Sequence, residues 1–224
     1  MFGLLATQPK YNDLIKPFIS LAPATRLRST RSPIRLVARL PPLIHALEWM
    51  GGPFNPPNEV VSLLASGCPS RLIHVCVNIA FLVTGYSKRQ MAEERLPVYL
   101  AHTPSGTSTK NIVHWLKNIR SKKFQMYDYG SRGNQNKYGS SVAPEYDLSK
   151  VTNQHMAILW SKQDILAAAD DSTWLIGSLG NGNLLTNIVV PDSYNFGHID
   201  FIWGKDAGQL INVPVIRLLK DNMD

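Results

Sequence analysis

The stretch HMAILWSKQD, residues 155–164, begins with a short apolar run and ends in a polar turn that contains an aspartate. A second apolar run, residues 187–190, is ended by Pro191 and followed by a turn that carries His198. Short apolar runs bounded by turn residues are typical of buried strands. Because residues 165–179 between them are largely helical in pattern, the order strand–helix–strand predicts a parallel α/β sheet.

The same alternation extends to both sides of this region. Residues 14–25, LIKPFISLAPAT, contain the apolar run FISLA, which we interpret as a buried strand after a helix. Residues 206–222 are predicted to form a terminal helix. The pattern is that of the last part of a doubly wound sheet with a long helical insertion, or cap. We therefore predict core elements in residues 1–25, a cap in 26–150 and further core elements in 151–224.

The cap itself is predicted to be mostly helical. Apolar positions in residues 36–49 indicate a pair of amphipathic helices, and residues 111–119 indicate another helix. Residues 127–146 are rich in Gly, Asn and Tyr, and we expect a polar loop there.

The net charge of +7 owes much to arginines near the N-terminus. Arg28, Arg31, Arg35 and Arg39 recur at helical spacing, which predicts that they share one helix face. Such a face is either a solvated surface or one that attracts an anionic partner such as a lipid interface or nucleic acid. Because no aromatic interleaving and no nucleic-acid motif accompany these arginines, we expect no nucleic-acid partner.

Asp164 and His198 follow two predicted strands, and ligands of open α/β sheets sit outside the carboxyl ends of the strands. Their order along the chain is the order of an α/β-hydrolase after its nucleophile. In a Ser-His-Asp triad the histidine moves the serine proton and the aspartate orients the imidazole. The alternative is an aspartate that forms a turn and a histidine that is merely exposed. Asp170 and Asp171 are rival acids, but they fall inside a predicted helix.

Four blocks of the sequence resemble the acid lipase family, which includes the gastric and lysosomal acid lipases. The blocks are GHIDFIWGKDA (197–207), AILWSKQDILAAADD (157–171), AHTPSGTSTKNIVHWLKNIRSKKFQMYDYG (101–130) and LLATQPKYNDLIKPFISLAPAT (4–25). They resemble, in turn, the family's catalytic-histidine motif, the segment around its triad aspartate, its signature between cap and core, and the helix and strand after its nucleophile. Together they cover essentially the whole chain in the family's order.

The resemblance implies the C-terminal part of an α/β-hydrolase fold, with the last three strands of the sheet and a large, mostly helical cap. It also implies that Asp164 is the triad acid and His198 the triad base. Gly197 departs from the family, which commonly has Asn before the catalytic histidine, and we expect a glycine to loosen this turn.

The resemblance places a lid at about residues 55–85. Taken alone, Cys68 and Cys76 are either a disulfide or two free thiols, whereas the resemblance implies the lid disulfide of the family, here with a spacing one residue shorter. The apolar side chains of this region either meet a lipid surface or pack in the core; they include Ile73, Phe81, Leu82 and Val83.

No G-x-S-x-G occurs in the 224 residues, and the family's serine elbow precedes the helix predicted at residues 1–9. We therefore expect that the chain lacks the nucleophile segment and is inactive alone as a lipase or carboxylic ester hydrolase. The alternative is a non-catalytic product that binds lipid or a partner.

The resemblance implies lipid ester substrates at a lipid–water interface and a secreted or lysosomal location. We expect no signal peptide, because residues 1–13 lack a basic region, a long apolar region and a cleavage site. We expect no transmembrane helix, because no apolar run reaches about 18 residues. No metal or organic cofactor is expected, and the oligomeric state is left open.

Overall fold

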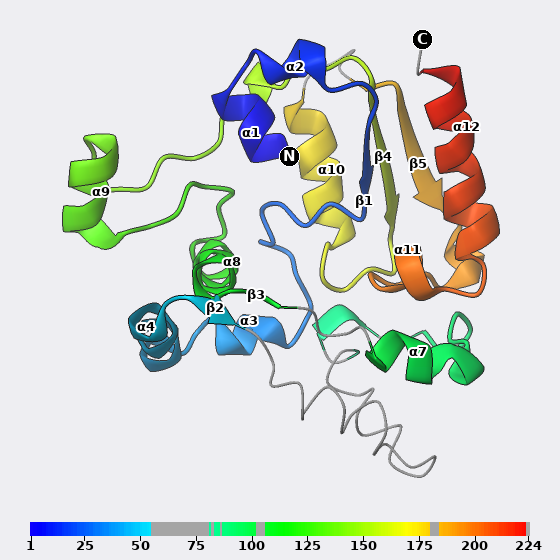
Figure 1. The fold of residues 1–224 in the computed structure, drawn as a ribbon, viewed down its shortest axis with the longest axis horizontal. Helices are drawn as coiled ribbons and strands as arrows, with labels where there is room; N and C mark the ends of the chain where they lie inside the picture. The colour runs from blue at the N-terminus through cyan, green and yellow to red at the C-terminus, as the bar shows by residue number, and fades with distance from the viewer. Residues whose placement is uncertain (55–80, 82, 86, 102–105, 180–183, 223–224) are drawn as a thin grey trace.

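The computed structural model describes residues 1–54, 81, 83–85, 87–101, 106–179 and 184–222. Its centre is a parallel sheet of three strands in the order β1 (Phe18–Leu21), β4 (Met156–Ser161) and β5 (Thr186–Val190) (Figure 1). In the pairing of β1 with β4, Phe18 lies opposite Met156. The three predicted strands are therefore present, and the chain has the expected mixed α/β character.

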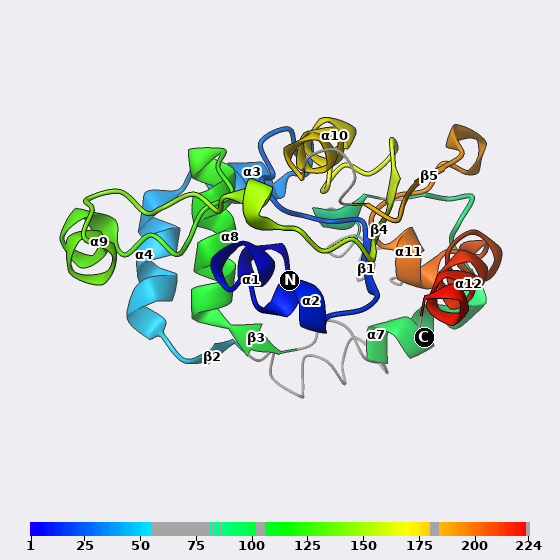
Figure 2. The same ribbon diagram turned by 90° about the horizontal axis from the view of Figure 1, so that it is seen from above.

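Helices cover both faces of this sheet (Figures 1 and 2). One face carries α1 (Phe2–Thr7) and α10 (Ala169–Ser178), and α2 (Tyr11–Leu14) follows α1. The other face carries α11 (Asp200–Trp203), the π-helical turn η4 (Gly208–Asn212) and α12 (Val213–Asp221). The short 3-10 turns η2 (Leu148–Lys150) and η3 (Asp192–Tyr194) lie in the connections.

The central strand β4 explains these two layers. All six of its residues are buried, as expected for a strand of a parallel sheet that is covered on both faces. Met156, Ile158 and Trp160 pack in the cluster that contains Leu5 of α1 and Leu175 of α10. Because side chains alternate along a strand, Ala157 and Leu159 face the other way and pack with Phe201 and Ile211.

The regular structure in the described residues between β1 and β4 consists mainly of short helices. It contains α3 (Ile34–Val37), α4 (Pro41–Met50), the 3-10 turn η1 (Glu93–Arg95), α7 (Leu96–Ala101), α8 (Thr109–Ser121) and α9 (Gly130–Tyr138). A small antiparallel pair, β2 (Pro53–Phe54) and β3 (Thr107–Ser108), joins residues far apart in the chain. Ile44 of α4 packs with Val113 and Leu116 of α8 in a separate apolar cluster.

Several expectations for this segment and its neighbours were wrong in detail. Residues 127–146 were expected to form a polar loop, but part of this region is the helix α9. Arg28 and Arg31 lie before α3, so the four arginines do not share one helix face. Most apolar side chains of the predicted amphipathic pair are exposed, and Trp49 is 89% exposed. The helix expected over 165–179 begins only at Ala169.

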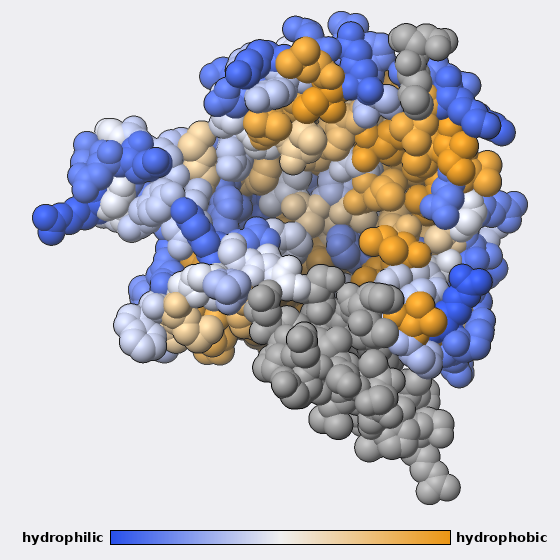
Figure 3. Space-filling view, viewed as in Figure 1, coloured by the Kyte–Doolittle hydropathy of each residue, from blue (hydrophilic) through white to orange (hydrophobic). Residues whose placement is uncertain are grey.

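Apolar surface is unevenly distributed on the face of the molecule seen in Figure 3. It gathers over α12 and the neighbouring strands, whereas the region of α9 is hydrophilic. The exposed apolar side chains on these elements include Leu21, Leu185, Val189, Val213 and Ile216. Within the described residues, β1 pairs with β4 alone. No helix in the described residues is long and apolar enough to cross a membrane.

Candidate functional site

Asp164 is held in a buried turn directly after β4. One of its oxygens, Oδ1, accepts hydrogen bonds from the backbone N–H groups of Leu166 at 2.8 Å and Ala167 at 2.9 Å. The residue is only 1% exposed. These two bonds fix the plane of the carboxylate and satisfy two backbone N–H groups of the turn before α10.

His198 reaches the other oxygen of this carboxylate. It lies in the loop after β5, and its Nδ1 is 2.8 Å from Asp164 Oδ2. The imidazole is 21% exposed, whereas the carboxylate is buried. Because a carboxylate oxygen accepts hydrogen bonds, the contact fits a donor N–H at Nδ1 and leaves Nε2 outside this hydrogen bond. The expected meeting of the two residues is therefore present.

The two rival aspartates lie elsewhere. Asp170 is exposed at the start of α10. Asp171 is buried, and its oxygens accept hydrogen bonds from Arg26 Nε at 3.1 Å and from the backbone N–H of Ser29 at 2.7 Å. Asp171 therefore ties the segment after β1 to α10.

A further carboxylate, which the sequence did not single out, lies beside the pair. Asp200 is buried in the first turn of α11, and its Oδ2 accepts the backbone N–H of Gly197 at 2.7 Å. Burial and the charge of Asp164 raise the pKa of Asp200 to about 6, although the bond from Gly197 opposes this shift. The turn before His198, expected to be loose because of the glycine, is thus held by a charge-assisted hydrogen bond. Only the spacing of Asp200 two residues after His198 was visible in the sequence.

The raised pKa of Asp200 predicts a specific pH dependence of stability. A carboxyl with a raised folded-state pKa contributes its stability below the unfolded pKa near 4 and loses it as pH rises through about 6. Asp200→Asn keeps an acceptor oxygen and does not ionise. Relative to this variant, the wild-type chain should lose up to about 3 kcal/mol of unfolding free energy between pH 4 and pH 7. Urea unfolding at both pH values measures the difference, and a difference independent of pH would contradict the assignment.

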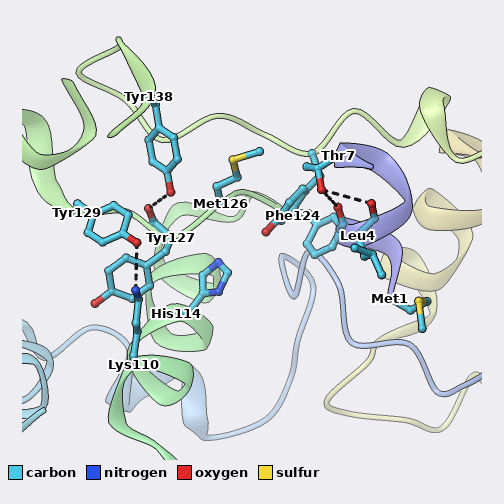
Figure 4. Close-up of a pocket in the computed structure, with 12 residues that line it drawn as sticks. Met1, Leu4, Thr7, Lys110, His114, Phe124, Met126, Tyr127, Tyr129 and Tyr138 are labelled. Atoms are coloured by element: carbon cyan, nitrogen blue, oxygen red, sulfur yellow. Dashed lines mark hydrogen bonds between the residues drawn. The ribbon is translucent and has the colours of Figure 1, made fainter. Parts of the chain in front are cut away.

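A cavity lies away from the Asp164–His198 pair. It has a volume of about 600 Å³ and lies between α1, α8 and the residues that follow α8 (Figure 4). In Figure 4 Lys110 points between the rings of Tyr127 and Tyr129, and its Nζ is 3.0 Å from Tyr129 Oη. His114 at its wall donates a hydrogen bond from Nε2 to the backbone oxygen of Gln125 at 2.8 Å, which is a structural contact. Neither Asp164 nor His198 lines this cavity.

Part of the predicted lid can be placed. Phe81 is buried and packs edge-to-face on Trp203 of α11, with ring centroids 6.5 Å apart. Phe81 therefore favours the core-packing alternative over a lipid-facing role. Cys68 and Cys76, for which the resemblance implies a disulfide, lie outside the described residues, as do Ile73 and Leu82. Among the described residues there is no group of three or more His, Cys, Asp and Glu side chains that could hold a metal ion.

The fold and the pair define the chain as part of an α/β protein with an aspartate–histidine dyad at the carboxyl edge of its parallel sheet. No protein-family model matches the sequence. The chain is 33% identical to the lipase lipl-1 of Caenorhabditis elegans, over 95% of this chain and 53% of that protein. It is 32% identical to the human gastric triacylglycerol lipase, over 99% of this chain and 55% of that protein.

The rat lysosomal acid lipase/cholesteryl ester hydrolase is also 32% identical, over 98% of this chain and 54% of that protein. The chain is therefore a homologue of gastric and lysosomal acid lipases over nearly all of its length, which confirms the resemblance to that family. It spans about half the length of the curated relatives that it matches.

Proposed function

We propose that this chain supplies the acid and the base of a Ser-His-Asp ester hydrolase of the acid lipase type. The observation that carries the proposal is the 2.8 Å contact between His198 Nδ1 and the buried carboxylate of Asp164. It joins the loops after β4 and β5, two neighbouring parallel strands. The homology to acid lipases supports the same reaction class, and the sheet is compatible with part of an α/β-hydrolase fold.

In the proposed reaction, His198 Nε2 takes the proton of a serine hydroxyl as the serine oxygen attacks the ester carbonyl carbon. The tetrahedral intermediate collapses, the alcohol leaves with the proton from Nε2, and an acyl-serine remains. A water molecule then attacks the acyl carbon and loses its proton to Nε2. As this second tetrahedral intermediate collapses, the bond to the serine oxygen breaks, Nε2 returns the proton to that oxygen, and the fatty acid is released. Asp164 stabilises the imidazolium at each step, and the backbone N–H groups of Leu166 and Ala167 keep its carboxylate aimed at the ring.

The serine and the oxyanion donors are proposed to come from polypeptide outside these 224 residues. The sequence contains no G-x-S-x-G, and we propose that this motif precedes the helix α1 in the whole protein. The edge of β1 that does not pair with β4 offers a site for the additional strands that such a fold requires. We therefore propose that the 224-residue chain is inactive alone.

The proposed substrates are esters of lipids, since the relatives are named as triacylglycerol and cholesteryl ester hydrolases. We propose that residues 26–150 form the cap over the acyl chain, with residues of about 55–85 as its lid at the lipid–water interface. The same relatives support a secreted or lysosomal location. No cofactor is needed for this mechanism, because the nucleophile, the base and the acid are all side chains.

A fusion protein tests the proposal. The part of the human gastric relative that this chain does not match is joined before Met1, and hydrolysis of p-nitrophenyl butyrate is measured. The chain alone should show no hydrolysis above background, because loss of the nucleophile costs about 10⁶-fold in rate. The fusion should hydrolyse the ester. Hydrolysis by the chain alone that His198→Ala abolishes would contradict an external nucleophile, and a folded but inactive fusion would favour the non-catalytic alternative.

A further inference from the structure

A fully buried glutamine lies against the loop that carries His198. Gln90 has no exposed surface, although glutamine is usually found at the protein surface. The groups that its side chain binds belong to residues 104 and 116 positions later in the sequence. Local sequence patterns therefore do not predict these hydrogen bonds. Buried amides are normally retained only where their hydrogen-bonding groups are satisfied, and the partners of Gln90 are therefore informative.

The side chain of Gln90 binds both ends of the loop between residues 194 and 206. Its Nε2 donates to the backbone oxygen of Tyr194 at 3.0 Å and to Asp206 Oδ2 at 2.8 Å. Its Oε1 accepts the backbone N–H of Asp206 at 3.1 Å. The backbone oxygen of Gln90 also accepts the N–H of Lys205 at 2.9 Å. Tyr194 precedes His198 by four residues and Asp206 follows it by eight, so one amide group connects the two ends.

The neighbours of Gln90 support the same contact. The guanidinium of Arg89 stacks over the ring of Tyr194, 5.3 Å from its centroid, and donates to the backbone oxygen of Ser193. Gly204 permits the close approach, since a Cβ at this position would lie 3.1 Å from Gln90 Oε1 and 2.6 Å from the backbone oxygen of Asp200. The loop is thus fixed on the Gln90 side by several independent contacts.

We propose that Gln90 is a positioning residue that holds the two ends of the 194–206 loop together and thereby sets the distance between His198 and Asp164. The inference rests on the proposed function, because the position of the imidazole matters only if it acts as a base. Within the loop, the bond from Gly197 N–H to Asp200 completes the link from the fixed ends to His198. The hydrogen bonds described for the side chain of Gln90 go to Tyr194 and Asp206, and not to Asp164 or His198.

The test uses the low-field NMR resonance of the proton between His198 Nδ1 and Asp164 in the ¹⁵N-labelled chain, assigned by its absence in His198→Ala. Gln90→Glu keeps the shape of the side chain, removes both Nε2 donors and brings a second carboxylate against Asp206. This resonance should be lost in Gln90→Glu while thermal unfolding stays cooperative. In the fusion protein, the same variant should lower kcat by ~10²-fold with KM unchanged, as expected from a misplaced base.

Three matched variants isolate the effect. Gln135→Glu makes the same charge change at an exposed position of α9 and should keep the resonance. Asp206→Asn alone should also keep it, because its amide oxygen still accepts from Gln90 Nε2. Combined with Gln90→Glu, Asp206→Asn supplies a donor to the new carboxylate and should restore the resonance in part.

A folded Gln90→Glu variant that retains the resonance would overturn the positioning role, whereas its absence in the wild-type chain would overturn the catalytic pair itself. If Gln90→Glu does not fold, Gln90→Asn serves in its place, because its shorter amide cannot reach both Tyr194 and Asp206. The same loss is then expected, and persistence of the resonance would again overturn the proposal.

Discussion

In the fusion protein, His198→Ala is expected to lower kcat for p-nitrophenyl butyrate by about 10⁶-fold. The reason is that the serine hydroxyl then has no base within reach and the leaving alcohol has no acid, so the nucleophile is no longer activated. Asp164→Asn should cost about 10⁴-fold, because the amide orients the wrong imidazole tautomer while the ring stays in place. Steady-state hydrolysis by purified variants measures both effects.

His45→Ala is the matched control for this prediction. His45 lies on α4 with an exposed imidazole near Glu48, far from the loops after β4 and β5 in the sequence and outside the pair. It should leave kcat unchanged. If His198→Ala retained activity similar to that of His45→Ala while both were folded, the Asp164–His198 contact would be structural and the proposed chemistry would have no base.

The pair itself could be predicted from the sequence for a simple physical reason. Strand β4 and strand β5 are short apolar runs bounded by turn residues, and parallel neighbours bring their carboxyl ends to one edge. The positions of Asp164 and His198 after these runs indicate that they lie at one edge of the sheet. The resemblance to the acid lipase family was needed to choose these two residues over a turn aspartate and an exposed histidine.

Other parts of the fold depend on contacts that local patterns do not contain. Helix α9 has few apolar residues, and its start is held by Asn134, which accepts the N–H of Tyr129 at 2.8 Å and donates to Asp128 Oδ1 at 2.7 Å. Helix α10 begins only at Ala169, a boundary that the helical pattern of residues 165–179 does not show. Gln90 and Asp200 are polar residues whose burial results from partners elsewhere in the fold, so their importance could not be predicted from their neighbours in sequence.

The second large expected effect is on stability. It distinguishes the role of Asp171 from that of Asp164, the other buried aspartate in residues 164–171. Asp171→Ala is expected to lower the unfolding free energy of the chain by about 3–5 kcal/mol. The substitution leaves the Arg26 guanidinium, which is largely buried and stacks on Trp174 at 4.2 Å, without its carboxylate partner. It also leaves the N–H of Ser29 without its acceptor. Urea unfolding followed by tryptophan fluorescence measures the change.

Asp170→Ala provides the matched control, because Asp170 is the adjacent residue, carries the same charge and is exposed at the N-terminal turn of α10. Its loss should cost no more than about 1 kcal/mol, the usual contribution of a carboxylate to a helix N-terminus. In the fusion protein, neither substitution should remove the low-field resonance of His198 as long as the variant is folded. If Asp171→Ala instead left stability unchanged and removed that resonance, Asp171 and not Asp164 would be the acid of the pair, since only the true partner of the imidazole affects its Nδ1 proton directly.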